Sequence, residues 1–372
     1  MLQRLSPRMR RNILRILPFG VIWLLFSQVF LLSDYAAVGD FSNVPDTAIK
    51  LDFGIYCFAT LAVSVLGLLV GTIELVYLNN RFAHQSLSRK IVYKTLFYAL
   101  LMLGITVTTF PIAAVMELDT TLMDGRVWHK LSTFLVSKTH LGTVVQLSAT
   151  LGASLFYAEI SEHMGHKVLL NFFTGKYHTP REEVRIFMFS DMKSSTHIAE
   201  QIGHIKYFEL LRAYYVDLSE GIIAHAGEIY QYVGDEVIVS WPVEEGLKNR
   251  NCLQCFFAMK HDLRKRADWY RRHFGLVPDF KAGFHVGAVT TGEIGALKKE
   301  IIFTGDVLNA TARIQGRCNT YGVDLLISGD LLERLGLEAG GTVRSLGEHK
   351  LRGKARKVQL FTLAGGPATA SA

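Results

Sequence analysis

Four long apolar segments in the first 158 residues constrain the fold of this chain more than any other feature of its sequence. The segments cover residues 13–32, 53–78, 95–116 and 141–158, and the last is the shortest and most polar. A membrane-spanning helix needs about 20 predominantly apolar residues. The first segment lacks a small-residue cleavage site and is followed by further spans, which is typical of a signal anchor. We therefore predict a membrane domain of four transmembrane helices over residues 1–158.

The composition of the whole chain agrees with membrane insertion. Hydrophobic residues make up 49% of the sequence and charged residues 20%, against about 25% charged residues in ordinary soluble domains. The 4 cysteines among 372 residues are no disulfide framework. Glu74 interrupts the second segment near its end, and we expect it to form a hydrogen bond inside the bundle or to reach the interface.

The distribution of lysine and arginine predicts the orientation of the spans. Residues 1–12 and the loop 79–94 each carry 4 basic residues and no acidic one, whereas acidic residues outnumber basic ones in loops 33–50 and 117–133. Short cytoplasmic loops carry the excess of basic residues. We therefore place the N-terminus, loop 79–94 and everything after residue 158 in the cytoplasm, at a bacterial inner membrane. The net charge of +7 is explained by this topology, so no nucleic-acid partner is expected.

After the last span the pattern changes. Residues 159–183 are expected to form a juxtamembrane coupling helix or linker, with stop signals at Gly175 and Pro180. Residues 184–364 alternate short strands with amphipathic helices. We expect strands at 184–190, 228–233, 237–241, 281–286, 290–294, 300–304, 325–328 and 359–363, and helices at about 198–218, 248–273 and 306–319. This pattern predicts an α/β (α+β) domain with a mostly antiparallel sheet, followed by a tail at 365–372.

Two acidic residues lie where metal ligands are found. Asp191 follows the first strand and precedes a polar turn that opens a helix, and such a turn offers free N–H groups to phosphate oxygens. Asp235 lies in a Gly-Asp hairpin turn beside the neighbouring strand. Two carboxylates on adjacent strands can hold a pair of Mg²⁺ ions that bridge a triphosphate. Taken alone, an aspartate at either position more often serves only the turn.

A third element lies on the helix that follows residue 305. Asn309 and Arg313 are four residues apart, so they share one helix face. An amide and a guanidinium on one face suit a polar, anionic ligand, and they suit a solvated face equally well.

Together these motifs resemble the catalytic domain of the class III adenylate and guanylate (nucleotidyl) cyclases. The resemblance covers about half of the chain and extends to bacterial membrane-anchored cyclases. It is carried, in order, by Phe189–Met192, Tyr232–Glu236, Ala282–Gly287, Gly305–Arg313 and Leu351–Lys354.

The resemblance implies a role for each matching residue. Asp191 and Asp235 would bind two Mg²⁺ or Mn²⁺ ions per site, one of which lowers the pKa of the ribose 3′-hydroxyl. Asn309 would orient the ribose, and Arg313 would stabilise charge on the α-phosphoryl group. The phosphates would be bound by Met192, Ser195, Thr196 and Arg352. In this family the site forms between two catalytic domains, so a homodimer through these domains is implied.

Two residues depart from the family at the positions that read the purine base. Gln231 stands where adenylate cyclases commonly have lysine and guanylate cyclases glutamate, and Ile302 stands where aspartate or threonine is usual. Glutamine can donate and accept, so it can pair with either purine. ATP preference, weak discrimination between ATP and GTP, and a different purine pose all remain open, and family prevalence favours ATP.

The sequence therefore predicts a membrane-anchored adenylate cyclase that converts ATP to cyclic AMP and pyrophosphate. One alternative is a guanylate or poorly selective purine nucleotidyl cyclase. Another is a catalytically weak, nucleotide-binding membrane receptor, which the altered base-reading residues favour. A nucleotide-gated transporter is disfavoured because the spans lack paired charges at mid-membrane.

Overall fold

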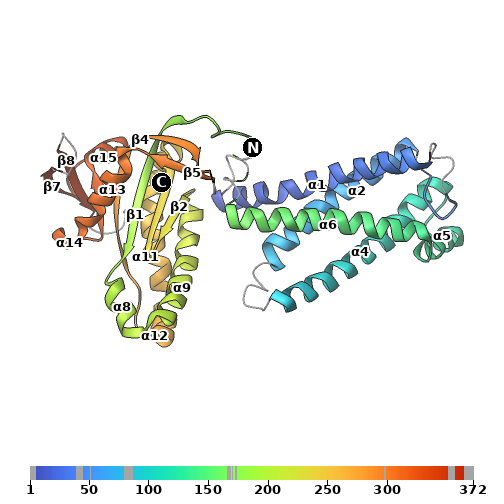
Figure 1. Ribbon diagram of the computed structural model, residues 1–372, viewed down its shortest axis with the longest axis horizontal. Coiled ribbons are helices and arrows are strands. Elements are labelled where there is room, and N and C mark those ends of the chain that lie inside the picture. Colours follow the sequence, from blue (N-terminus) through green and yellow to red (C-terminus); the bar gives the residue numbers. More distant parts are fainter. Residues whose placement is uncertain are drawn as a thin grey trace. The chain divides into compact units, whose positions relative to one another are not determined.

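A computed structural model of the chain describes residues 6–38, 45–50, 52–78, 87–165, 169, 171, 174–296, 299–350 and 357–363. Contacts divide it into two compact units, one of which is Met9–Leu170, while the other contains Asn171–Ala372 together with Met1–Arg8 (Figure 1). Each unit is described by itself.

The first unit is built from long apolar helices. These are α1 (Pro7–Val38), α2 (Phe53–Thr72), the π-helical turn η3 (Ile73–Leu78), α4 (Leu87–Leu118) and α6 (Lys138–Met164). Four stretches among the described residues are long and apolar enough to cross a membrane, namely Met9–Ala36, Phe53–Leu78, Val92–Leu118 and Lys138–Glu162. Each of the four predicted segments lies within one of them.

Small residues let these helices pack closely. A Cβ atom at Gly67 would lie 2.7 Å from Cβ of Trp23, so α1 and α2 touch there through a glycine. The indole of Trp23 donates a hydrogen bond of 2.8 Å to Ser154 of α6. Glu74 is buried, forms an ion pair with Lys94, and accepts a 2.6 Å hydrogen bond from the hydroxyl of Tyr98. The expected hydrogen bond of Glu74 inside the bundle is therefore confirmed.

A short helix, α5 (Gly125–Leu135), lies in the region expected to be a loop between the third and fourth segments. It is amphipathic, and it buries Val127, Leu131 and Phe134. The ring of Phe134 stacks on Phe110 of α4 at 4.3 Å between centroids. The loop prediction was wrong here because a few apolar residues at helical spacing suffice to pack a helix onto its neighbours.

The second unit is built around one eight-stranded sheet. Its strands are β1 (Arg181–Met192), β2 (Glu228–Val233), β3 (Glu236–Pro242), β4 (Phe280–Ile294), β5 (Glu300–Thr304), β6 (Leu325–Ser328), β7 (Val343–His349) and β8 (Val358–Leu363). The order is β2-β3-β1-β4-β6-β8-β7, with β5 paired to the end of β4. Among the described pairings only β4–β6 is parallel. The predicted α/β fold with a mostly antiparallel sheet is confirmed.

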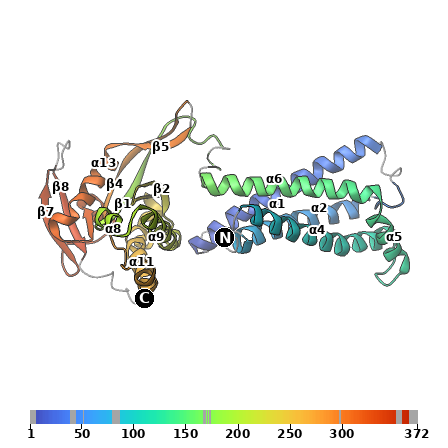
Figure 2. The same cartoon turned by 60° about the horizontal axis from the view of Figure 1, so that its bottom comes forward.

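The predicted pair of strands at 281–286 and 290–294 was wrong, because β4 is one continuous strand. Residues 287–289 do not turn but continue the antiparallel ladder with β1, where Gly287 pairs with Arg185. A Cβ at Gly287 would lie 3.0 Å from Cβ of Val307, so this glycine serves close packing rather than a turn. β5 folds back on the end of β4, and Figure 2 shows this hairpin extending from the body of the sheet.

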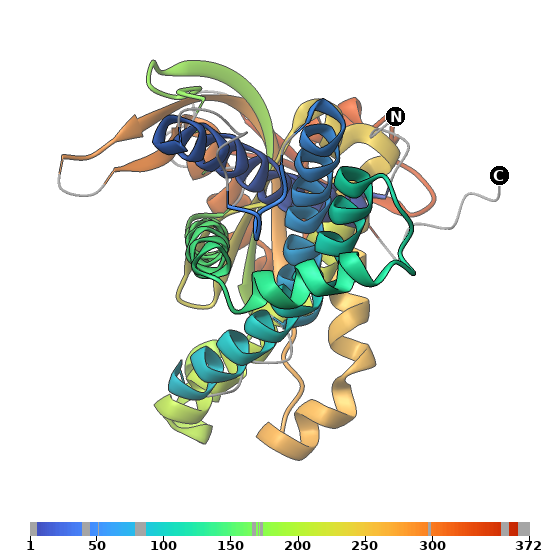
Figure 3. The same ribbon diagram turned by 90° about the vertical axis from the view of Figure 1, so that its right-hand side faces the viewer.

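Several predicted helices are broken or were missed. Gly203, with φ +82°, separates α8 (Ser195–Ile202) from α9 (His204–Ala224). The chain turns at Arg266 between α11 (Asn251–Lys265) and α12 (Ala267–Phe274) (Figure 3). The last predicted helix divides into α13 (Asp306–Gly316) and α14 (Cys318–Tyr321). The unpredicted elements are α10 (Val243–Leu247), α15 (Gly329–Arg334) and β7. The first residues of the predicted helix 248–273 form a separate 3-10 turn, η4 (Lys248–Arg250).

Different helices pack against the two faces of the sheet. Alternate residues of β1, such as Ile186 and Met188, pack under α9 and α11 in the main core. The residues between them, Phe187 and Phe189, face the other side, where Val307 of α13 packs against them. Helix α13 therefore lies on the sheet face that also carries the side chain of Asp191, since side chains alternate along a strand.

Candidate active site

Asp191 lies next to last in β1. One of its carboxylate oxygens lies 3.3 Å from the ammonium of Lys281 in β4 and accepts a 3.3 Å hydrogen bond from the side-chain amide of Gln315 in α13. The strand and two neighbouring elements thus fix the position of this carboxylate.

Asp235 reaches the same end of β1 through the β2–β3 turn. Ser190 pairs with Val237 at the start of β3, which places the turn beside the end of β1. Gly234 has φ +63°, a conformation that favours glycine, and its carbonyl accepts a hydrogen bond from the hydroxyl of Tyr215. The turn is therefore held by both its backbone conformation and a side chain of α9.

The two carboxylates lie close enough to repel each other. Burial and then the negative charge of Asp191 raise the pKa of Asp235, while the nearby hydroxyl of Ser195 opposes the shift. Burial, Asp191 and Asp235 together raise the pKa of Glu236 to about 7. In the described part of the chain, the buried Oδ2 atom of Asp235 has no hydrogen-bond partner. The site therefore has an excess of negative charge and an unused oxygen ligand.

This arrangement fits a divalent cation. Carboxylate oxygens are the ligands that Mg²⁺ and Mn²⁺ prefer, and such ions commonly use one or two carboxylates together with substrate phosphates. The described residues contain no cluster of three or more His, Cys, Asp or Glu side chains that could hold a metal ion. Further ligands would then come from a phosphorylated substrate or from water.

The turn after β1 offers mainly backbone groups. The side chain of Met192 is buried in the core, so only its backbone is available. Ser195 begins α8 and lies beside Asp235. Thr196, the next residue of this helix, is exposed. The first N–H groups of a helix have no intrahelical partner and attract anions.

Asn309 and Arg313 share the face of α13 that is turned away from the sheet. The buried residues of α13 include Val307, Ala310 and Ile314, whereas Asn309 is exposed and Arg313 is half-buried. Within the described ranges, neither side chain has a hydrogen bond or an ion pair, with the two aspartates or with any other residue. The structure thus brings Asp191 and Asp235 together and leaves the amide and the guanidinium apart from them.

The two predicted base-reading residues also lie on separate strands. Gln231 is exposed on β2, and Ile302 is half-buried on β5 opposite Gly292. The adjacent residues connect β2 with β5: the backbone amide of Phe303 donates a 3.3 Å hydrogen bond to the hydroxyl of Tyr230. Arg352, the predicted phosphate-binding residue, lies outside the described residues.

Sequence reasoning missed Lys281 and Gln315, the two partners of Asp191. Gln315 carried a usable signal, because it is a polar residue on a mostly apolar helix face that includes Ala310 and Ile314. A buried polar side chain normally has a specific partner. Lys281 carried none, because it lies 90 residues from Asp191 along the chain.

Residues 176–365 match the model of a family described as the adenylate and guanylate cyclase catalytic domain. Adenylate cyclase 2 of Rhizobium meliloti (strain 1021) is 33% identical over 61% of the chain and 62% of that relative. Adenylate cyclase 1 of the same organism is 29% identical over 50% of the chain and 28% of that relative. The chain thus spans less than two thirds of either relative. A solved structure of a bacterial light-regulated adenylyl cyclase has the same fold, with a TM-score of 0.52 and 19% identity over 62% of this chain and 67% of that one.

Proposed function

Because the chain belongs to the adenylate and guanylate cyclase catalytic domain family, we propose that it is a membrane-anchored adenylate cyclase that converts ATP to 3′,5′-cyclic AMP and pyrophosphate. The observation that carries the proposal is the pair Asp191 and Asp235, which share one end of the sheet with an unused buried oxygen. The names of the curated relatives support ATP as the substrate.

In this proposal the chain's own residues bind and orient the nucleotide. Asp191 and Asp235 hold Mg²⁺ or Mn²⁺, which supplies the positive charge that lowers the pKa of the ribose 3′-hydroxyl and neutralises the triphosphate. Lys281 and Gln315 position the Asp191 carboxylate. The backbone from Met192 to Thr196 and the hydroxyl of Ser195 bind phosphate oxygens at the start of α8, and Arg352 adds a further positive charge.

The chemical step forms one phosphorus–oxygen bond and breaks another. The ribose O3′ bonds to the α-phosphorus, the bond from that phosphorus to the bridging oxygen of the leaving pyrophosphate breaks, and the hydroxyl proton passes to solvent. Asn309 holds the ribose, and Arg313 stabilises the charge that develops on the α-phosphoryl oxygens. Such electrostatic stabilisation is usually the largest contribution to a reaction of this kind.

Asn309 and Arg313 serve this step only if a second chain presents them. They lie outside the buried face of α13, and among the described residues they form no hydrogen bond or ion pair with the two aspartates of their own chain, so we propose a homodimer through the catalytic domains with two symmetric sites. Large apolar side chains are exposed on α9, namely Ile205, Phe208 and Val216, with 83%, 64% and 65% of their surface accessible. An exposed apolar patch of this kind is typical of an interaction surface.

The membrane part of the proposal rests on the four apolar helices and the basic loops. We propose that residues 1–158 anchor the enzyme in the bilayer of a bacterial inner membrane, with the N-terminus and the catalytic domain in the cytoplasm. Residues 159–183 then connect the anchor to the catalytic domain at 184–364, and 365–372 form a tail.

The first experiment measures product formation by the full chain in nanodiscs. ATP and GTP are supplied separately with Mg²⁺ or Mn²⁺, and Arg313→Ala is compared with Arg317→Ala, which removes the same charge one turn further along the chain. Cyclic AMP that is lost only in Arg313→Ala supports the proposal. Formation of cyclic GMP from GTP would agree with the proposed mechanism but would contradict ATP as the substrate. Binding of both nucleotides without any cyclic product would indicate the nucleotide-binding receptor instead.

A mixing experiment tests the shared site. Asp191→Asn and Arg313→Ala are each expected to be inactive alone. In randomly paired dimers, half of the molecules carry one of each and have one intact site of two, so the mixture regains about a quarter of the wild-type activity. A mixture as inactive as its components, despite exchange of subunits, would contradict the dimeric site.

The base preference is tested at Gln231. Guanine presents N–H donors where adenine presents an acceptor and an amino group, so a carboxylate at this position favours GTP. Gln231→Glu is expected to move the ratio of cyclic AMP to cyclic GMP formation toward GTP by about tenfold. An unchanged ratio would show that Gln231 does not contact the base.

A further inference from the structure

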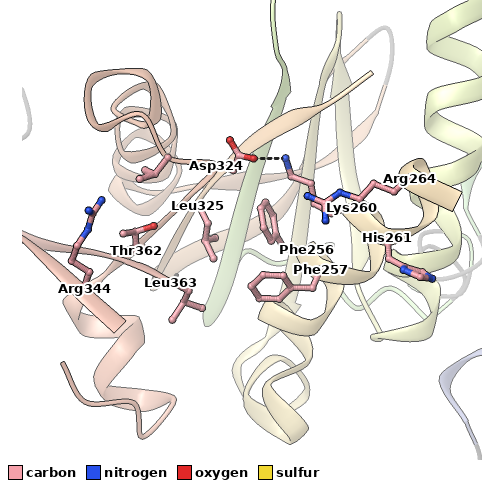
Figure 4. A pocket seen from close by; sticks show the side chains of 11 residues that line it. Phe256, Phe257, Lys260, His261, Arg264, Asp324, Leu325, Arg344, Thr362 and Leu363 are labelled. Carbon is pink, nitrogen blue, oxygen red and sulfur yellow. Dashed lines mark hydrogen bonds and ion pairs between the residues drawn. The ribbon is translucent and has the colours of Figure 1, made fainter. Parts of the chain in front are cut away.

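A cavity of about 550 Å³ lies on the catalytic unit away from the two aspartates. Its walls come from one face of α11 and from the strands at the other end of the sheet, with Asp324 and Leu325 between them (Figure 4). This volume lies within the range of about 300–1,000 Å³ that is typical of small-molecule sites. Among the described residues, none of those assigned to nucleotide binding lines it.

The lining combines apolar surface with unpaired positive charge. Phe256 and Phe257 of α11 lie opposite Leu363 of β8 and provide flat apolar walls. Arg264 of α11 and Arg344 of β7 are exposed at the cavity, and in the part of the chain that the structure describes neither has an acidic partner. The cavity therefore suits a ligand with an apolar body and an anionic group.

Asp324, the one acidic residue among the described residues that line the cavity, does not cancel this charge. Asp324 contacts Lys260, at 2.8 Å, and Lys193, at 2.5 Å. Lys260 is only 6% exposed, and it also forms an ion pair with Asp279. Two lysines and two aspartates thus neutralise one another, which leaves the two arginines as the excess charge.

The same four residues connect the cavity to the proposed active site. Lys260 and Asp324 line the cavity, whereas Lys193 lies two residues after Asp191, in the turn that opens α8. Lys193 is 2.8 Å from Asp279 and shares Asp324 with Lys260. An anion placed against Lys260 competes with Asp324 for that lysine, and this changes the partners left to Lys193.

We propose that this cavity binds an amphipathic organic anion and that its occupancy is transmitted to the nucleotide site through Lys260, Asp324 and Lys193. The ligand has a flat or acyl apolar body that packs on Phe256 and Phe257 and a carboxylate or phosphate that lies against Lys260, where the positive charges of Arg264 and Arg344 attract it. Transmission, unlike binding, rests on the proposed function, because it assumes that the Asp191 turn binds ATP.

The binding half is tested with 1-naphthyl phosphate, and with 1-naphthol as the uncharged match. Equilibrium dialysis uses the full chain in nanodiscs, with empty nanodiscs subtracted. The double variant Arg264→Gln/Arg344→Gln is expected to weaken binding of the phosphate by at least about tenfold, because it removes both of the positive charges that attract the phosphate into the cavity. Lys265→Gln, which removes a charge from the adjacent α11 position outside the cavity, is expected to leave binding unchanged. Equal binding to the wild type and the double variant would overturn the site.

The transmission half is tested by the affinity for ATP rather than by turnover. Saturating 1-naphthyl phosphate is expected to change the Kd of ATP by about fivefold or more in the wild type and not in the double variant. Binding free energies are reciprocal, so ATP must change the Kd of 1-naphthyl phosphate by the same factor. An unchanged Kd for ATP while 1-naphthyl phosphate is bound would disprove the coupling, whether or not cyclic AMP is made.

Discussion

Two pairs of aspartates in the catalytic unit have opposite electrostatic surroundings. Asp191 and Asp235 face each other with Lys281 as the one ammonium beside them in the described structure, at 3.3 Å from Asp191. Asp279 and Asp324 instead share two lysines, and each carboxylate contacts both. The first pair is short of positive charge, whereas the second is neutralised.

The pKa shifts follow these surroundings. Burial and the neighbouring carboxylate raise the pKa of Asp235. Burial also disfavours the charged forms of Asp279 and Asp324, but hydrogen bonds from Lys193 and Lys260 outweigh it and lower both pKa values. Repulsion in the first pair costs stability that a bound cation would restore, while the second pair contributes stability to the fold. The comparison separates a binding site from a structural cluster on physical grounds.

The largest expected effect is the loss of activity in Asp235→Asn. The neutral amide is a poor ligand for a divalent cation, so we expect the rate of cyclic AMP formation to fall by about a thousandfold. The measurement is product formation by the full chain at saturating Mg²⁺ and ATP. Asp262→Asn, on α11 and outside both clusters, is the control and is expected to remain active. Substantial activity in Asp235→Asn would remove this residue from the site.

The next largest effect is expected from the neutralised pair. Lys260→Met leaves Asp279 and Asp324 with Lys193 as their remaining partner among the described residues, and their side chains are 43% and 39% exposed. Because solvent screens such part-exposed carboxylates, we expect a cost of about 1–2 kcal/mol. For a unit of this size that corresponds to a fall in Tm of about 5 °C. Thermal unfolding of the full chain in nanodiscs, followed by tryptophan fluorescence, measures it.

The control is Lys265→Met, which removes an exposed lysine from the same helix and is expected to change Tm by less than about 2 °C. An equal fall in both variants would show that the loss comes from the helix and not from the ion cluster.

Local motifs made the first pair predictable. Asp191 and Asp235 each lie at the end of a short apolar run, where the order of residues alone marks a strand end or a tight turn. The second pair could not be found in this way. Lys193 and Asp279 are 86 residues apart, and Lys260 and Asp324 are 64 apart, so only the folded sheet brings them together.

The same distinction applies to the fold. The hydropathy pattern located the four apolar helices and most strands, because their period is visible within a few residues. Strand β7 was missed because its outer residues are exposed and polar, as in Arg344 and Glu348. Strand β4 was predicted as two strands, 281–286 and 290–294, with a break at residues 287–289. The glycine in that break, Gly287, instead allows the close approach of Val307, which lies on a helix 20 residues later in the chain.

A pH series sharpens the comparison further. Acids with lowered pKa values stabilise the fold above their unfolded value, about 3.8 for Asp279 and Asp324, and this contribution is lost as the pH falls through the folded pKa. The difference in Tm between the wild type and Lys260→Met is therefore expected to be constant from pH 7 to about 5 and to shrink below about 4. A difference that persists at pH 3 would mean that packing of the Lys260 stem on Phe280 dominates, where the ammonium lies 4.8 Å from the ring centroid.

The smallest expected effect is a gain in stability from a variant that destroys activity. At pH 7 without divalent cations, Asp235→Asn removes one of two repelling charges and gives the orphaned buried position a donor that can reach Asp191. We expect Tm to rise by about 2–4 °C, which corresponds to about 1 kcal/mol. Addition of Mg²⁺ with ATP should then stabilise the wild type and not the variant, because ligand binding to the folded state raises Tm only where the site is intact. A variant that is less stable than the wild type in metal-free buffer would mean that the Asp235 carboxylate supports the β2–β3 turn, and the contrast between the two aspartate pairs would fail.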